Sequence, residues 1–131
     1  MFVDASALVA VIVREPDAAT LSSRIRRASD RFTSSIALYE TALAVGRVRN
    51  APVVGALGVV DRFVSRASIQ TIPITAEIGR LAIEAFAHFG RGNHAAQLNM
   101  GDCFAYACAR SLGVPLLCKG NDFPQTDIAL A

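Results

Sequence analysis

Short strand-like segments alternate along this chain with longer segments whose apolar residues recur at helical spacing. The predicted strands are residues 1–4, 31–34, 69–74 and 115–118, with a short fifth strand at 126–130. The predicted helices are residues 5–13, 17–29, 36–49, 53–67, 75–89 and 101–112. Strands that alternate with helices form right-handed crossovers. The pattern therefore predicts an α/β fold with a central parallel sheet of four or five strands and helices on both faces.

Capping and helix-breaking residues support these boundaries. Pro16 ends the first helix, because the residue before a proline avoids the helical region. Ser34 or Ser35 is expected to cap the helix that follows, and Thr75 to cap a later one. Residues 90–99 form the only long loop that the pattern predicts. No repeat or linker-like stretch divides residues 1–131, which indicates a single domain.

Four acidic residues interrupt segments that otherwise have the composition of a core. Asp4 and Asp122 follow predicted strands, Asp102 opens a predicted helix, and Glu40 lies inside another. Because ligands of an open parallel sheet bind beyond the carboxyl ends of its strands, such a fold can gather all four side chains. Carboxylates that lie together repel one another unless a cation holds them. The pattern suits Mg²⁺ or Mn²⁺, hard cations that commonly act on phosphate groups.

Ordinary local roles also account for three of these acids. Asp4 can cap the first helix, and Asp102 can form a capping box with Asn99. Asp122 lies in a turn, where a carboxylate is common. The hydroxyl of Ser6 is either part of the helix entrance or a group that orients Asp4 or a water molecule. Taken singly, these positions leave the question open.

Glu40 has no such explanation. The residue three positions before it is Ala37, whose side chain has no oxygen for a capping box. Its helical neighbours include Ile36 and Leu43, so the carboxylate is expected to be partly buried on an apolar stripe. Pairing with Tyr39 or an arginine remains open. A buried and unpaired carboxylate is costly and often marks a functional site.

Composition narrows the class of protein. With 53% hydrophobic and 18% charged residues, the chain is able to build a core and is not a disordered segment. No apolar run reaches the length of a membrane span, and an acid stands where a signal peptide carries positive charge, so we expect a cytoplasmic protein. Three cysteines form neither a disulfide framework nor a zinc motif, which indicates buried thiols.

Basic residues add a weaker indication. Twelve of the thirteen are arginines, which bind phosphate oxygens in pairs, although genome base composition explains the excess equally well. Arg91 in the long loop and Lys119 near the last acid are candidates to contact RNA phosphates, with Asn121 beside them. Solvated surface charge is an equal alternative for both cations. His88 and His94 lie in no recognisable nucleophile motif.

Three longer strings and a short one extend this picture. They are MFVDASALVAVIVREP, SSIALYETALA, LNMGDCFAYACARSLGVPLLCKGNDF and TDI. In order and spacing the chain resembles PIN-domain ribonucleases of the VapC type, the toxin half of bacterial type II toxin–antitoxin pairs. The resemblance covers essentially the whole chain.

The resemblance implies a site and partners. It places the Mg²⁺- or Mn²⁺-dependent phosphodiesterase site of the family on Asp4, Glu40, Asp102 and Asp122, and the family's small hydroxyl residue on Ser6. It also implies an RNA substrate, a homodimer and a VapB-like antitoxin whose C-terminal tail enters the active-site groove. No acid of the family's set is missing, so the resemblance implies an active enzyme.

Rival classes fit less well. A haloacid-dehalogenase-like phosphatase has a second aspartate two residues after the first, and Ser6 stands there in this chain. A receiver domain needs an acidic pair after the first strand and a phosphoacceptor after the third, and residues 69–74 supply none. A catalytically silent PIN-like binding module, with acids that only cap helices, leaves Glu40 unexplained.

Overall fold

The computed structural model describes residues 1–131, which form a four-stranded sheet in which every pair of neighbouring strands is parallel. The strands are β1 (Phe2–Val3), β2 (Phe32–Ser34), β3 (Gln70–Ile72) and β4 (Leu116–Leu117). Their order across the sheet is β3-β2-β1-β4, so β1 and β4 are neighbours although they lie at opposite ends of the sequence. The predicted α/β class is confirmed.

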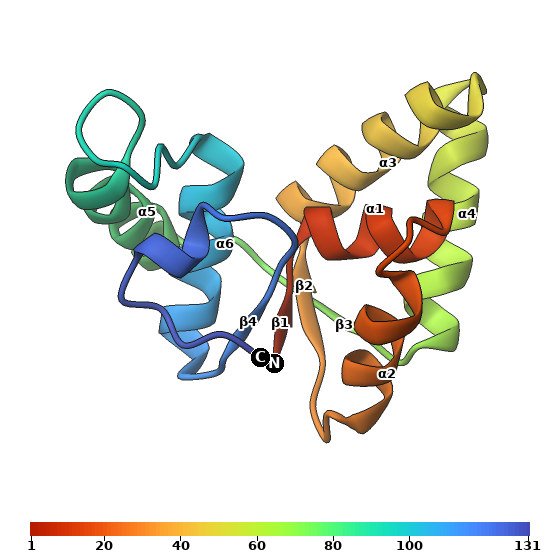
Figure 1. The fold of residues 1–131 in the computed structure, drawn as a ribbon, viewed down its shortest axis with the longest axis horizontal. Coiled ribbons are helices and arrows are strands. Elements are labelled where there is room, and N and C mark those ends of the chain that lie inside the picture. Colours follow the sequence, from red (N-terminus) through yellow and green to blue (C-terminus); the bar gives the residue numbers. More distant parts are fainter.

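Helices cover both faces of this sheet, as predicted (Figure 1). They are α1 (Ala5–Val13), α2 (Ala18–Arg27), α3 (Ser35–Arg49), α4 (Val53–Arg66), α5 (Ala76–Phe89) and α6 (Met100–Leu112), with a 3₁₀ turn η1 at Phe123–Gln125. In Figure 1, α5 and α6 lie on one side of the strands, and α1, α2 and α4 lie on the other. No single helix is long and apolar enough to cross a membrane; α3 and α4 reach that length only together, bent by 118°.

The alternation of side chains along the two central strands divides the core into layers. Phe2 and Leu116 pack with α5 and α6, whereas Val3 and Leu117 pack with α1 and α2. All four side chains are almost completely buried. Because successive residues of a strand point to opposite faces, even two-residue strands join both layers. Cys103 and Cys108 are buried thiols, as predicted, and no disulfide forms.

All five predicted strands are shorter in the structure, and the third and the fifth differ most. The third ends at Ile72, because Pro73 has no backbone N–H to donate to the ladder. The predicted fifth strand is reduced to one parallel bridge between Leu130 and Leu116. Residues 123–125 form a 3₁₀ turn that the pattern did not predict. These corrections affect the edge of the sheet and leave its centre unchanged.

Helix entrances lie directly at the carboxyl ends of the strands. α1 begins two residues after Val3 with Asp4 as its cap, and α3 begins immediately after Ser34, whose Oγ accepts from the Ala37 N–H at 3.2 Å. Such short connections leave no room for a loop between strand and helix. The first turn of each helix is therefore fixed at one edge of the sheet, and any side chain there is positioned by the backbone itself.

Candidate active site

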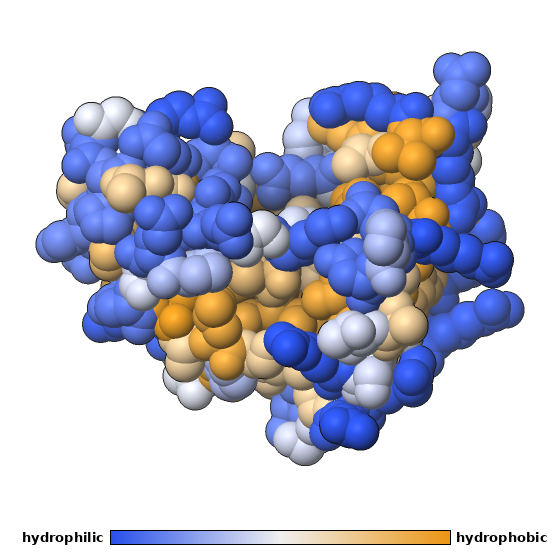
Figure 2. Space-filling model, in the orientation of Figure 1, coloured by the Kyte–Doolittle hydropathy of each residue, from blue (hydrophilic) through white to orange (hydrophobic).

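A pocket of about 610 Å³ lies at this edge, above the carboxyl ends of β1 and β4. Figure 2 shows the surface hollowed at the top of the view, between the side formed by α6 and the side formed by α3. The residues that line it come from four parts of the chain and include Asp4, Ser6, Glu15, Glu40, Asp102 and Lys119. Three of the four predicted acids therefore lie in one pocket.

Asp4 is the most deeply buried of these acids, with 4% of its surface exposed. Its Oδ2 accepts hydrogen bonds from the Ser6 N–H at 2.9 Å and from the Ser6 hydroxyl at 2.5 Å. Burial raises the pKa of Asp4, and the bonds from Ser6 oppose that rise. Asp4 is thus both the predicted cap and a pocket residue, and Ser6 is the group that orients it.

Glu40 reaches the pocket from the middle of α3. It forms no hydrogen bond or ion pair within the chain, and the neighbouring Tyr39 is 64% exposed, so the predicted alternative of pairing is wrong. Partial burial, together with the charges of Asp4 and Asp102, raises the pKa of Glu40 to about 7. An unpaired carboxylate held beside two others is ready to bind a cation.

Gly101 makes this position of Glu40 possible. A Cβ atom added to Gly101 would overlap the Glu40 carboxylate, whereas one added to Gly55 would meet nothing within 4 Å. The carboxylate therefore packs directly on the backbone of the first turn of α6. Gly101 was not among the residues predicted from the sequence. A glycine within the first turn of a helix, next to a candidate site acid, was the available signal.

Asp102 combines a capping box with a place in the pocket. Its Oδ2 accepts from the Asn99 N–H at 2.8 Å, and its own N–H donates to Asn99 Oδ1 at 3.1 Å. The pKa of Asp102 is raised to about 6, mainly by burial and also by the charges of Asp4 and Asp122, against the opposing effects of the Asn99 hydrogen bond and of Arg91. Asp102 therefore caps a helix and lines the pocket at the same time, as Asp4 does.

Asp122 lies near the acids without lining the pocket. It is exposed and precedes η1, and its charge contributes to the raised pKa of both Asp102 and Cys118. Arg91 is exposed as well, and its charge reaches Asp102. Asn121 is exposed, and its carbonyl accepts from the Gln125 side chain at 2.9 Å. Roles for these three residues stay predictions.

Lys119 is held at the pocket by two sets of contacts. Its backbone N–H donates to Ser6 Oγ at 2.9 Å, which ties the segment after β4 to the start of α1. Its ammonium group forms ion pairs with Glu15 and Asp17. Lys119 is therefore a paired residue and not a freely solvated surface charge. Glu15 was missed from the sequence, because its position just after α1 gave no sign that it would face this pocket.

The donor atoms of the pocket suit a hard divalent cation. No group of three or more histidine, cysteine, aspartate or glutamate side chains has direct metal-binding geometry. Mg²⁺, however, is usually held by one or two protein carboxylates and keeps several waters, so it does not need three direct ligands. The pocket offers carboxylate oxygens, with no imidazole among its lining residues. Burial raises the pKa of all three acids, and neighbouring carboxylates raise the pKa values of Glu40 and Asp102 further, so a cation would offset the negative charge there.

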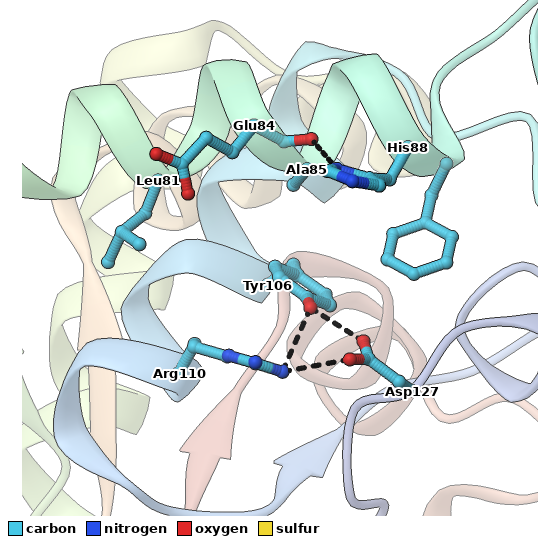
Figure 3. A pocket seen from close by; sticks show the side chains of 8 residues that line it. Leu81, Glu84, Ala85, His88, Tyr106, Arg110 and Asp127 are labelled. Carbon is cyan, nitrogen blue, oxygen red and sulfur yellow. Dashed lines mark hydrogen bonds and ion pairs between the residues drawn. The ribbon is translucent and has the colours of Figure 1, made fainter.

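A second pocket, of about 190 Å³ between α5 and α6, makes a useful contrast (Figure 3). The Asp127 carboxylate here is already neutralised: the Tyr106 hydroxyl donates to Asp127 Oδ1 at 2.6 Å, and Arg110 donates to Oδ2 at 2.9 Å. His88 lies here, far along α5 from the acids, and its ring bonds to the Glu84 carbonyl. This cluster anchors the C-terminal segment to α6, and its acid Asp127 is paired, whereas Glu84 at the same pocket is exposed to solvent.

The raised pKa values predict how stability depends on pH. Glu40 rises from 4.5 to about 7 and Asp102 from 3.8 to about 6, so the folded protein holds these protons more tightly than the unfolded chain. The stability that these two protonated side chains contribute is fully present at a pH below their pKa values in the unfolded chain. It is lost as pH rises from there through their folded-state pKa values of about 6 and about 7. In EDTA, we expect the free energy of unfolding to fall by about 2 kcal/mol across this window, after allowance for solvent screening.

Urea unfolding at several pH values measures this effect. Glu40→Gln should flatten the dependence, whereas Glu84→Gln, at an exposed position of α5, should leave it as in the wild type. Stability that rises between pH 4.5 and 7 would contradict the proposed repulsion among the acids.

Fold and pocket together define a class: a parallel α/β protein with an acid-lined pocket beyond the carboxyl ends of its central strands. Residues 1–129 match the model of the PIN domain. The chain belongs to the PIN-domain family. This assignment replaces the phosphatase and receiver-domain alternatives.

Relatives and a solved structure agree with this assignment. The chain is 38% identical to ribonuclease VapC30 of Mycobacterium tuberculosis, with 98% of the chain and 96% of the relative covered. It is 36% identical to the VapC ribonuclease R02377 of Rhizobium meliloti, covering 97% and 98%. The crystal structure of Mycobacterium tuberculosis VapC20, described as a sarcin–ricin loop cleaving toxin, superposes with a TM-score of 0.78 over 99% of this chain and 97% of that one. Its sequence identity is 16%, so the likeness concerns the fold.

Proposed function

We propose that this protein is a Mg²⁺- or Mn²⁺-dependent endoribonuclease and the toxin of a VapBC-type toxin–antitoxin module. The observation that carries the proposal is the meeting of Asp4, Glu40 and Asp102 in one pocket, with the pKa of each raised by burial. Relatives that are named ribonucleases and align over nearly the whole chain support the same activity.

The chain's own residues provide a prearranged set of oxygen donors. Ser6 fixes the orientation of Asp4, and Asn99 fixes that of Asp102, so neither carboxylate has to reorganise on binding. Glu40 completes the set from α3. Asp122 lies close enough for its charge to act on Asp102. A bound divalent cation supplies Lewis acidity, which polarises water and phosphate oxygens and offsets the charge that develops during cleavage.

Proton release is linked to cation binding at these side chains. Near neutral pH, Glu40 is partly protonated because its pKa is about 7. A cation binds the ionised form, so Glu40 and Asp102 release protons when the site is filled. The affinity for the cation should therefore rise with pH up to about 7.

Surface composition supports the proposed partners. Val53, Val54 and Leu57 of α4 are exposed apolar side chains, and so are Ile83 of α5 and Met100 of α6. Exposed apolar patches mark interaction surfaces, which is consistent with a homodimer and with a bound VapB-like antitoxin. The uncompensated acids offer a place for a basic residue of the antitoxin. We place this module in the cytoplasm, where its RNA substrates are found.

RNA cleavage by the purified protein tests the function. With Mg²⁺ or Mn²⁺ present, we expect total cellular RNA to be cut at a small number of positions, which sequencing of the new RNA ends identifies. A protein that is folded and supplied with cation but leaves transfer, ribosomal and messenger RNA intact would contradict the proposal. Co-purification with the product of the neighbouring gene is the parallel test of the antitoxin.

A further inference from the structure

Lys119 is the only lysine in the chain, and it lies on the rim of the acidic pocket. All other basic residues are arginines. The backbone of Lys119 is fixed, because its N–H donates to Ser6 Oγ, the same hydroxyl that donates to Asp4. Gly120 follows with φ of +106°, a conformation that turns the chain sharply and that glycine adopts without strain. The Cα of Lys119 is thus held close to the acids, and only its side chain is free to move.

The ammonium group of Lys119 is held loosely. It pairs with Glu15 and with Asp17, where the Nζ–Oδ1 distance is 3.3 Å. Between 32% and 39% of each of these side chains is exposed. Ion pairs with this much exposure contribute little to stability. A phosphate anion that enters the pocket is able to compete with the two carboxylates for this cation.

We propose that Lys119 binds a phosphate of the RNA next to the scissile bond, and that Glu15 and Asp17 hold its ammonium group at the rim until RNA enters. This inference rests on the proposed ribonuclease activity. Lysine suits such an exchange better than arginine, because its point charge sits on a flexible stem. The planar guanidinium would bind the two acids with several fixed hydrogen bonds. In this proposal Glu15 and Asp17 keep the Lys119 ammonium group near the path of the substrate and away from Asp4 and Asp102.

The salt dependence of RNA binding tests the phosphate contact. We would measure binding of a fluorescein-labelled single-stranded RNA of mixed sequence, with every variant made in the Asp102→Asn background so that the RNA stays intact. Lys119→Met should weaken binding and make the slope of log affinity against log salt shallower by about 0.7, the value for one lost phosphate contact on a single strand. Lys119→Arg should retain the slope but bind RNA more weakly than the parent, because its guanidinium leaves Glu15 and Asp17 less readily.

Arg66→Met is the matched control. Arg66 is exposed at the end of α4, which leads to the amino end of β3, so the same loss of charge occurs away from the pocket. This variant should keep the slope of the parent. An unchanged slope in Lys119→Met would overturn the proposal, and so would an equal change in Arg66→Met.

Replacement of Glu15 tests the direction of the effect that the ion pair has on RNA binding. If they compete with RNA for Lys119, Glu15→Gln should tighten RNA binding several-fold, and the gain should disappear when Lys119→Met is also present. Weaker RNA binding in Glu15→Gln would mean that the ion pair between Glu15 and Lys119 only stabilises the structure of the pocket rim. A gain that persists without Lys119 would mean general charge repulsion. Either result overturns the exchange, and Glu15→Gln alone decides the sign if Lys119→Met does not fold.

Cleavage by the wild-type protein is measured in parallel. Absence of cleavage would count against the ribonuclease proposal, whereas cleavage combined with an unchanged salt slope would count against Lys119 alone. The two failures are therefore distinguishable.

Discussion

Replacement of Asp102 by asparagine is expected to lower the rate of RNA cleavage by about 1000-fold or more, a loss typical of removing a central charge-stabilising group. Asparagine keeps an oxygen that can accept from the Asn99 N–H, so the entrance of α6 should survive. It removes the negative charge that a cation needs and that Asp4 and Glu40 experience as repulsion. The variant should therefore be inactive and at least as stable as the wild type in EDTA. Cleavage of a labelled RNA and urea unfolding measure the two effects.

Asp4→Asn is expected to behave in the same way, because Asp4 lines the same pocket. Asp61→Asn, at an exposed position of α4, makes the same change of charge away from the site and should cleave like the wild type. Substantial activity in Asp102→Asn would show that the pocket acids do not carry the reaction.

Gly101→Ala is expected to lower cleavage by about 10- to 100-fold without unfolding the protein, since small displacements of a catalytic group cost this much. The added methyl group would overlap the Glu40 carboxylate, which then has to turn out of the pocket. Alanine is otherwise favourable in a helix, so the backbone of α6 should remain intact. The loss of activity thus comes from one displaced carboxylate and not from a damaged fold.

Gly55→Ala is the matched control, because a Cβ at that position of α4 meets nothing within 4 Å. It should be as active as the wild type and slightly more stable. Equal activity in Gly101→Ala and the wild type would mean that Glu40 is not needed where the structure places it.

Much of the fold was predictable because helix and strand signals are local. Proline, glycine and capping residues marked the ends of helices, and Ser34, Thr75 and Asn99 cap helices as expected. The short central strands were found because their residues are buried on both faces. The predicted fifth strand failed for the opposite reason. Its segment pairs through Leu130 alone, and its position depends on the Tyr106–Arg110–Asp127 contacts, which join residues distant in sequence.

In the site too, the residues that were predicted have local signals in the sequence, and the residues that were missed depend on contacts between distant parts of the chain. Asp4 and Asp102 stand at predicted helix entrances, and Glu40 stood out as an acid with no local partner. Glu15 and Gly101 acquire their roles only from contacts across the pocket, with Lys119 and Glu40 respectively. Such contacts depend on how α1, α3, α6 and the segment after β4 pack together. Nothing in the local pattern of residues specifies that arrangement.

The measurement that tests the central claim most directly is RNA cleavage by the purified protein as divalent cation is removed and returned. We predict that EDTA stops cleavage completely, that excess Mn²⁺ or Mg²⁺ restores it, and that neither cation restores it in Asp102→Asn. Cleavage that continues undiminished in EDTA would contradict the account, because the acids would then have no cation to hold.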